Sequence, residues 1–170
     1  MTHHHTVPLA VAVLISLSAL QGHAAPAGPF AGMAGSWSGG GSITMANGGQ
    51  EQLRCRANYQ VGGGGSQMQL SLRCASDGYN FNLVGDVESD GRAVSGSWSE
   101  TTRNASGTVS GRVNGDHIQV VARGGTFSAG LSLVTRGNRQ SVAIQPQGTE
   151  ISDVSITLAK GQATTTGAAR

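Results

Sequence analysis

Apolar and polar residues alternate through short segments of this chain, and each segment ends in a turn rich in Gly, Asn or Asp. Alternation with a period of two is typical of a β-strand that buries one face. Dipeptides such as Asp77-Gly78 suit the positive φ angles of two-residue hairpin loops. The pattern therefore predicts an all-β protein, an antiparallel up-and-down meander of about ten strands without a helix.

The same turns predict how the strands are aligned. A loop at Asp90-Gly91, for example, places Val87 opposite Val94, so that apolar residues pair with one another. Equivalent pairings follow from loops at Asn47-Gly48-Gly49, Gly64-Gly65, Asp77-Gly78, Arg103-Asn104, Asn114-Gly115, Gly124-Gly125 and Gly137-Asn138. A shift of one residue would move every apolar side chain to the other face, so consistent pairing across these turns supports the prediction.

A meander of this length has enough strands to curl until its first and last strands pair. Closure removes both exposed edges, at which other chains could otherwise add strands. We therefore expect a closed β-barrel, with an open or flattened sandwich as the alternative.

The N-terminal segment has the features of an export signal. Val7 to Leu20 is an apolar run of suitable length, and small residues follow it. We expect a signal peptide over residues 1–24, cleaved after Ala24, Ala25 or Ala27. An irregular lead-in (25–35), the barrel (36–160) and a disordered tail (161–170) complete the chain. The mature protein would then be periplasmic or secreted, with no membrane span.

The two cysteines of the chain support export. A hairpin at Gly64-Gly65 places Cys55 directly opposite Cys74, at a separation that suits a disulfide. Disulfides form in oxidising compartments outside the cytoplasm. A metal site is not expected, because the two cysteines have no further ligands and His117 is the only histidine of the mature chain.

Composition excludes other classes of function. The formal net charge is +2, which gives no electrostatic footprint for nucleic acid. Asp116 and His117 are adjacent, so alternation sends them to opposite faces, and no serine lies in a nucleophile-elbow motif. The sequence therefore predicts a protein that is not an enzyme and needs no cofactor.

The inward face mixes large rings with glycines, which leaves two interpretations open. The glycines let strands bend while the rings fill the interior, or they leave a cavity for a ligand. Large side chains gather near one end of the barrel, where Glu100 would be a polar anchor at an apolar mouth. The candidate ligand-binding residues are Tyr79, Phe81, Trp98, Glu100 and Phe127.

The other end holds Trp37 and Tyr59, and here the sequence resembles a known family. Gly35-Ser36-Trp37 is similar to the Gly-x-Trp motif that opens the first strand of lipocalins and related calycins. The resemblance implies that Trp37 closes one barrel end beside a basic residue, here Lys160 or Arg139. The chain lacks the long first loop and C-terminal helix of lipocalins. Its ten strands resemble the fatty-acid-binding branch, without the helical lid of that branch.

Three arginines, Arg54, Arg56 and Arg73, lie on the polar face. The register places Arg56 opposite Arg73, which is unfavourable unless an anion compensates. These residues are a candidate patch for an anionic envelope component.

Together these features predict an exported, non-catalytic barrel that binds a small apolar ligand at one end. The first alternative is an envelope interaction protein or inhibitor with a filled core. The second is an outer-membrane barrel, in which the apolar face would point outward to lipid.

Overall fold

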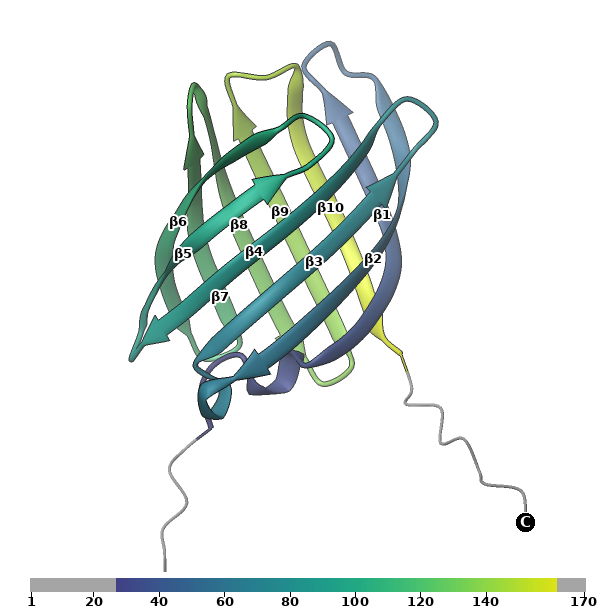
Figure 1. Cartoon of the computed structure of the whole chain (residues 1–170). Coiled ribbons are helices and arrows are strands. Elements are labelled where there is room, and N and C mark those ends of the chain that lie inside the picture. Colours follow the sequence, from purple (N-terminus) through teal and green to yellow (C-terminus); the bar gives the residue numbers. More distant parts are fainter. Residues whose placement is uncertain (1–26, 162–170) are drawn as a thin grey trace, which may run out of the picture.

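The computed structural model describes residues 27–161, in which ten antiparallel strands form one closed barrel (Figure 1). The strands are β1 (Gly35–Met45), β2 (Gln50–Gly62), β3 (Gln67–Ala75), β4 (Asn80–Asp90), β5 (Ala93–Glu100), β6 (Ala105–Asn114), β7 (His117–Gly124), β8 (Phe127–Arg136), β9 (Arg139–Gln147) and β10 (Ile151–Lys160). Because β1 pairs with β10, the predicted closed barrel is confirmed and the open sandwich is not formed. The predicted signal peptide lies outside the described residues, as does all of the predicted tail except Gly161.

Two short 3-10 helices interrupt the expected all-strand pattern. They are η1 (Ala31–Met33), in the lead-in to the barrel, and η2 (Gly63–Gly65), between β2 and β3. Both lie at the lower end of the barrel in Figure 1. In the part of the chain that the structure describes, no helix has the length and apolar character needed to cross a membrane.

The predicted register is correct in three hairpins and shifted by two residues in the others. The loops at Gly64-Gly65, Asp77-Gly78 and Gly137-Asn138 give the expected pairs. At the turn after β4, however, Val87 lies opposite Gly96 rather than Val94. A shift of two residues preserves the face on which each side chain lies, so the inward pattern survives the error.

In the hairpins with two-residue loops, the register shift has a common cause, which is the position of the glycine in the loop. Four hairpins place a glycine of positive φ at the first loop position, which is the preference of type II′ turns. These glycines are Gly91, Gly115, Gly125 and Gly137. The prediction put the glycine second, as in a type I′ turn, except at Gly137, where it was correct. The loops after β1 and β5 are longer than predicted, since Thr44 pairs with Gln50 and Glu100 with Ala105.

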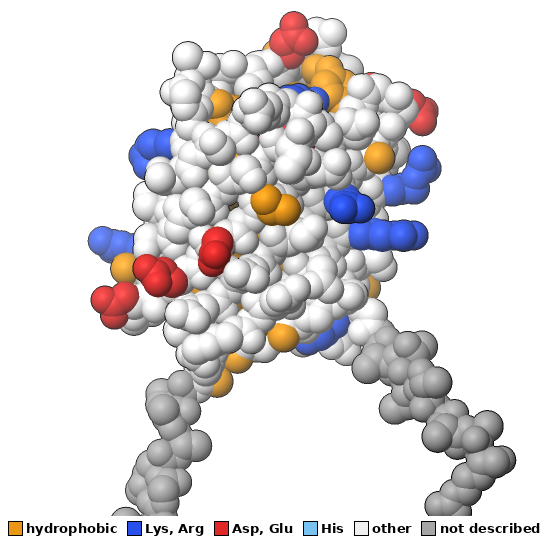
Figure 2. All heavy atoms as spheres, in the orientation of Figure 1, with side chains coloured by type: hydrophobic (Ala, Val, Ile, Leu, Met, Phe, Trp, Pro, Cys, Tyr) orange, Lys and Arg blue, Asp and Glu red, His pale blue; other side chains and the backbone are white. Residues whose placement is uncertain are grey.

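Apolar side chains fill the inward positions and polar ones cover the outside. Among the described residues, Val84 is the only large hydrophobic side chain that is exposed. Figure 2 shows an outer face that is mostly uncharged and polar, with few hydrophobic side chains. This is the reverse of the outer-membrane alternative, in which the apolar side chains face outward.

Inward glycines allow neighbouring strands to approach each other closely. A Cβ atom at Gly107 would lie 1.8 Å from the carbonyl oxygen of Arg123, and one at Gly111 would lie 2.0 Å from that of Gln119. Both oxygens belong to the backbone of β7, so no side chain fits between the strands at these positions. The glycines therefore serve the bending of the sheet, as the first of the two interpretations expected.

A disulfide ties β2 to β3, as predicted. Cys55 and Cys74 are paired across the two strands with a Cα–Cα distance of 4.2 Å. Both residues are buried within the apolar interior. The bond therefore reinforces the part of the wall next to β1.

Candidate ligand cavity

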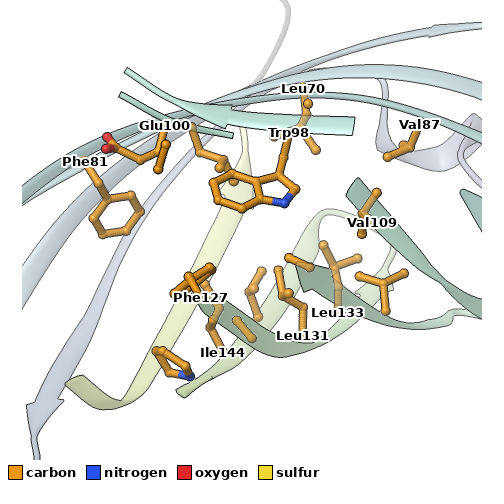
Figure 3. A pocket seen from close by; sticks show the side chains of 18 of the residues that line it. Leu70, Phe81, Val87, Trp98, Glu100, Val109, Phe127, Leu131, Leu133 and Ile144 are labelled. Carbon is orange, nitrogen blue, oxygen red and sulfur yellow. The ribbon is translucent and has the colours of Figure 1, made fainter. Parts of the chain in front are cut away.

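A cavity of about 420 Å³ occupies the barrel interior (Figure 3). Its volume falls within the range of roughly 300–1,000 Å³ that is usual for small-molecule sites. Inward side chains of β3 to β9 form most of its wall, among them Leu70, Val87, Val109, Leu131, Leu133 and Ile144. From β1 and β10 only Ile43 and Ile151 reach it. The barrel is therefore hollow on one side, which a uniformly filled core does not allow.

The predicted aromatic residues lie together at one end of this cavity. Tyr79, Phe81, Trp98 and Phe127 all line it, at the end that carries the β3–β4, β5–β6 and β7–β8 turns. The Trp98 and Phe127 rings contact edge to face, with centroids 5.7 Å apart, although β5 and β8 are not neighbours. Figure 3 shows them approaching each other from opposite walls. The Trp98 indole N–H is already satisfied by the Thr108 carbonyl oxygen at 3.2 Å, so the ring offers a ligand only its apolar surface.

Space for the Trp98 ring comes from two glycines, one on the adjacent strand β6 and one on β7. Trp98 pairs with Gly107, and a Cβ atom at Gly124 would lie 2.9 Å from Cζ2 of the indole. These inward glycines thus position an aromatic ring at the mouth as well as allowing the strands to bend.

Glu100 lines the mouth but is not a free polar anchor. Its Oε1 accepts hydrogen bonds from the backbone N–H groups of Asn82 and Thr102 and from the Thr102 hydroxyl, and its Oε2 accepts one from the Arg103 N–H. Burial raises the pKa of Glu100, but these hydrogen bonds outweigh that effect and hold the pKa below its ordinary value. The carboxylate therefore stabilises the β5–β6 turn.

Arg103 is a mouth residue that was not among the candidate ligand-binding residues predicted from the sequence. It lines the cavity from the β5–β6 turn, and its side chain is 52% exposed. Nη1 donates to the Asn80 carbonyl oxygen at 3.0 Å and to the Thr102 hydroxyl at 3.3 Å, and it lies 3.8 Å from Glu100 Oε2. The sequence carried a signal for this residue, since Arg103 stands in the turn that follows Trp98 and Glu100.

The opposite end of the barrel is closed. The Trp37 indole N–H donates to the Met33 carbonyl oxygen at 2.7 Å, and the Trp37 and Tyr59 rings contact edge to face. Lys160, rather than Arg139, supplies the basic group, with Nζ 5.5 Å from the centroid of a Trp37 ring. Phe30 is fully buried there and forms part of the cavity floor.

A polar pair lies inside this closed end. The Tyr59 hydroxyl donates to Gln140 Oε1 at 2.6 Å, and Gln140 Nε2 donates to the Thr135 hydroxyl at 3.0 Å. Gln140 is completely buried, and the strand pattern gave no sign of it because glutamine usually faces solvent. Burial raises the pKa of the Tyr59 hydroxyl, and its hydrogen bond to Gln140 only partly offsets this.

The candidate anion patch lies away from the cavity. Arg54, Arg56 and Arg73 are exposed, Arg56 lies opposite Arg73, and basic side chains gather over β2 and β3 in Figure 2. Binding of an anionic envelope component at this patch stays a prediction. Within residues 27–161, no group of His, Cys, Asp and Glu side chains is placed to hold a metal ion.

Comparisons with known proteins identify the fold and no family. No protein-family model matches the sequence, and neither does any curated protein. The crystal structure of Rv2717c from M. tuberculosis is similar, with a TM-score of 0.64 at 15% identity over 78% of this chain and 94% of that one. The S-type phycobiliprotein lyase CPES from Guillardia theta has a TM-score of 0.58 at 12% identity, over 79% and 91% of the two chains. The similarity to both structures covers most of each chain and concerns the barrel fold alone.

Proposed function

We propose that this protein binds a small apolar molecule inside the barrel and carries out no chemistry on it. The observation that carries the proposal is the apolar cavity of about 420 Å³, which has an aromatic mouth and a closed floor. Burial of a ligand's apolar surface in such a site is favourable by about 25 cal/mol per Å² before the costs of binding are subtracted.

The polar groups of the described residues support a role without catalysis. Glu100 is engaged by its own turn, and no second carboxylate lines the cavity. His117 Nε2 does lie 2.7 Å from the Ser132 hydroxyl, but on the polar outer face and outside the cavity. The neighbouring Asp116 is paired with Arg136, so the histidine has no orienting carboxylate of the kind that activates a serine.

The disulfide supports a place of action outside the cytoplasm. A buried bond between Cys55 and Cys74 is typical of proteins that mature in an oxidising compartment. Export by the predicted signal peptide, to the periplasm or the medium, is part of this proposal.

Native mass spectrometry of protein that was exported to a periplasm and purified without detergent tests the proposal. We expect a bound small molecule that is lost on denaturation. The same sample shows whether a Val120→Phe variant, which places a ring in the cavity from β7, loses this mass. The matched control is Val121→Phe, because the adjacent residue lies on the outer face of the same strand and pairs with Ser110 and Gly130. Equal retention by both variants would rule out the cavity as the site.

Variants at the mouth locate the ligand within the cavity. Trp98→Ala and Phe81→Ala remove ring surface from the lining and should abolish binding of apolar probes while the barrel stays folded. Val84→Ala serves as the control, because Val84 lies on the outer face of β4, close to both Phe81 and Trp98 along the sheet. Unchanged affinity in the two mouth variants would show that the ligand lies elsewhere.

A further inference from the structure

The charged groups around the cavity are confined to its mouth. Of the described residues that line it, only Glu100 and Arg103 carry a formal charge; Glu100 is the last residue of β5, and Arg103 lies in the turn that follows. Apart from Ser97 and Thr149, the other lining residues are apolar, so a charged group could not enter the cavity without losing its hydration. A ligand with one charged end would therefore keep that end at the mouth.

The two charges at the mouth differ in what they still offer to a ligand. Four hydrogen bonds from the turn and from β4 occupy the Glu100 carboxylate. Arg103 uses only Nη1, and its Nε and Nη2 donors have no partner among the described residues. A guanidinium carries five N–H donors in a fork that matches a carboxylate. The hydrogen-bond donors that stay free at the mouth thus belong to the cationic Arg103, whereas the acceptors of the anionic Glu100 are already used.

We propose that the ligand is an amphiphile with a single acidic group at one end, bound with its apolar body in the barrel and its acid against Arg103. This inference rests on the proposed function and names the class of molecule that the cavity takes. The acidic residues Asp77 and Glu150 also stand in turns at this end, but neither lines the cavity. Arg103 is therefore the charge that a head group at the mouth meets first.

Three probes that share one alkyl chain separate the head group from the chain. They are decanoate, 1-decanol and decyltrimethylammonium, each titrated below its micelle concentration into the full chain while tryptophan fluorescence is followed. Of the two tryptophans, Trp98 lines the cavity and Trp37 does not, so the signal reports on the mouth. We expect decanoate to bind about fivefold more tightly than decanol, the size usual for a partly exposed charge pair, and the ammonium probe to bind most weakly.

Variants of Arg103 assign the preference to this side chain. Arg103→Gln should remove the advantage of decanoate over decanol, and Arg103→Lys should keep most of it. The matched control is Arg123→Gln. This variant removes the same charge from an exposed residue of β7 that lies at the mouth end of the barrel but does not line the cavity. Raising the salt concentration should weaken decanoate binding and leave decanol binding unchanged.

The outcomes distinguish this inference from the proposed function. If none of the probes changes the fluorescence or adds mass to the wild-type protein, the proposed function fails and the head-group preference fails with it. If decanol binds as tightly as decanoate, or if Arg103→Gln weakens both probes equally, the cavity still binds apolar ligands but the acidic head group is overturned. Decanol binding to each variant also shows that the variant is folded.

Discussion

The inward side chains are packed more closely on one side of this barrel than on the other. On the side of β1, β2 and β10 the inward residues are tightly packed, and Trp37, Ile156 and Leu158 are each only 1% exposed. On the side of β4 to β8, Val87, Val109 and Ile118 are 8–9% exposed, and larger neighbours such as Leu133 are only partly buried. The alternation in sequence is the same on both sides. The difference lies in what packs against each side, because the lead-in residue Met33, which is hydrogen-bonded to Trp37, and the disulfide belong to the packed one.

This comparison predicts that the same substitution has unequal costs on the two sides. Leu158→Ala, in β10, should lower the free energy of unfolding by about 3–4 kcal/mol, since it opens a new void in a packed region. Leu131→Ala, in β8, only enlarges a cavity that already exists and should cost about 1 kcal/mol. Urea unfolding with an unchanged m-value measures both. Equal losses would show that the two sides do not differ in packing.

The disulfide tests whether the packed side can be weakened without affecting the hollow one. The double variant Cys55→Ser with Cys74→Ser opens a loop with a sequence separation of 19 residues and should lower the free energy of unfolding by about 3 kcal/mol. Because neither residue lines the cavity, affinity for an apolar probe should stay within twofold of the wild-type value. A large loss of affinity in a folded double variant would mean that the two sides are coupled.

The hydrogen bond between Tyr59 and Gln140 makes the packed side sensitive to alkaline pH. Burial raises the pKa of Tyr59 in the folded protein, so its contribution is fully present below the unfolded value of about 10 and is lost as the pH rises further. The free energy of unfolding should then fall by about 1.4 kcal/mol per pH unit. Tyr59→Phe should remove this slope, and at neutral pH it should cost about 2 kcal/mol because Gln140 Oε1 loses its donor.

Circular dichroism across the alkaline range follows unfolding of the wild-type protein and of Tyr59→Phe. A slope that persists in Tyr59→Phe would show that another group causes it and that the hydrogen bond to Gln140 is not its origin.

The sequence predicted the inward face of every strand but not which side would be hollow. Alternation determines the face, and a register error of two residues leaves the face unchanged. Alternation does not determine the distance between opposite walls, which depends on strand tilt and on segments such as η1 that lie at the end of the barrel. Of the two interpretations of the inward glycines, the structure supports bending, and the cavity is present as well. Close strand approach explains Gly107 and Gly111, whereas Gly85 lines the cavity with the Leu70 side chain packed against it.

The candidate site was predicted in part for the same reason. The aromatic residues at the mouth follow from alternation and turn positions, so Phe81, Trp98 and Phe127 line the cavity as expected. The state of Glu100 could not be predicted, because its partners are backbone N–H groups whose positions depend on a loop longer than the expected one. The longer loop also brings Arg103 to the cavity, where alternation along a strand does not apply.

The smallest expected effect on the free energy of unfolding concerns the hydrogen bonds that Glu100 accepts at the mouth of the cavity. Glu100→Gln places an amide donor among N–H groups that now donate to a carboxylate, and should lower the free energy of unfolding by about 1 kcal/mol at neutral pH. Because hydrogen bonds hold the folded pKa of Glu100 below its ordinary value, this contribution is present above the unfolded pKa of about 4.3 and is lost as the pH falls. The difference between wild type and variant should therefore shrink in acid.

Glu51 is the matched carboxylate on the packed side at the same end of the barrel. It accepts hydrogen bonds from the Ser76 hydroxyl and the Gly78 N–H, which lower its pKa, but it is less buried than Glu100. Glu51→Gln should therefore have a smaller effect than Glu100→Gln in urea unfolding at matched pH values. If Glu51→Gln is the less stable variant, the hydrogen bonds of Glu100 do not matter more than those of its counterpart on the packed side. Hydrogen bonds to turn carboxylates would then not compensate for weak packing around the cavity. If the Glu100 variant is the less stable one, the hollow side depends on its turns where the packed side depends on its core.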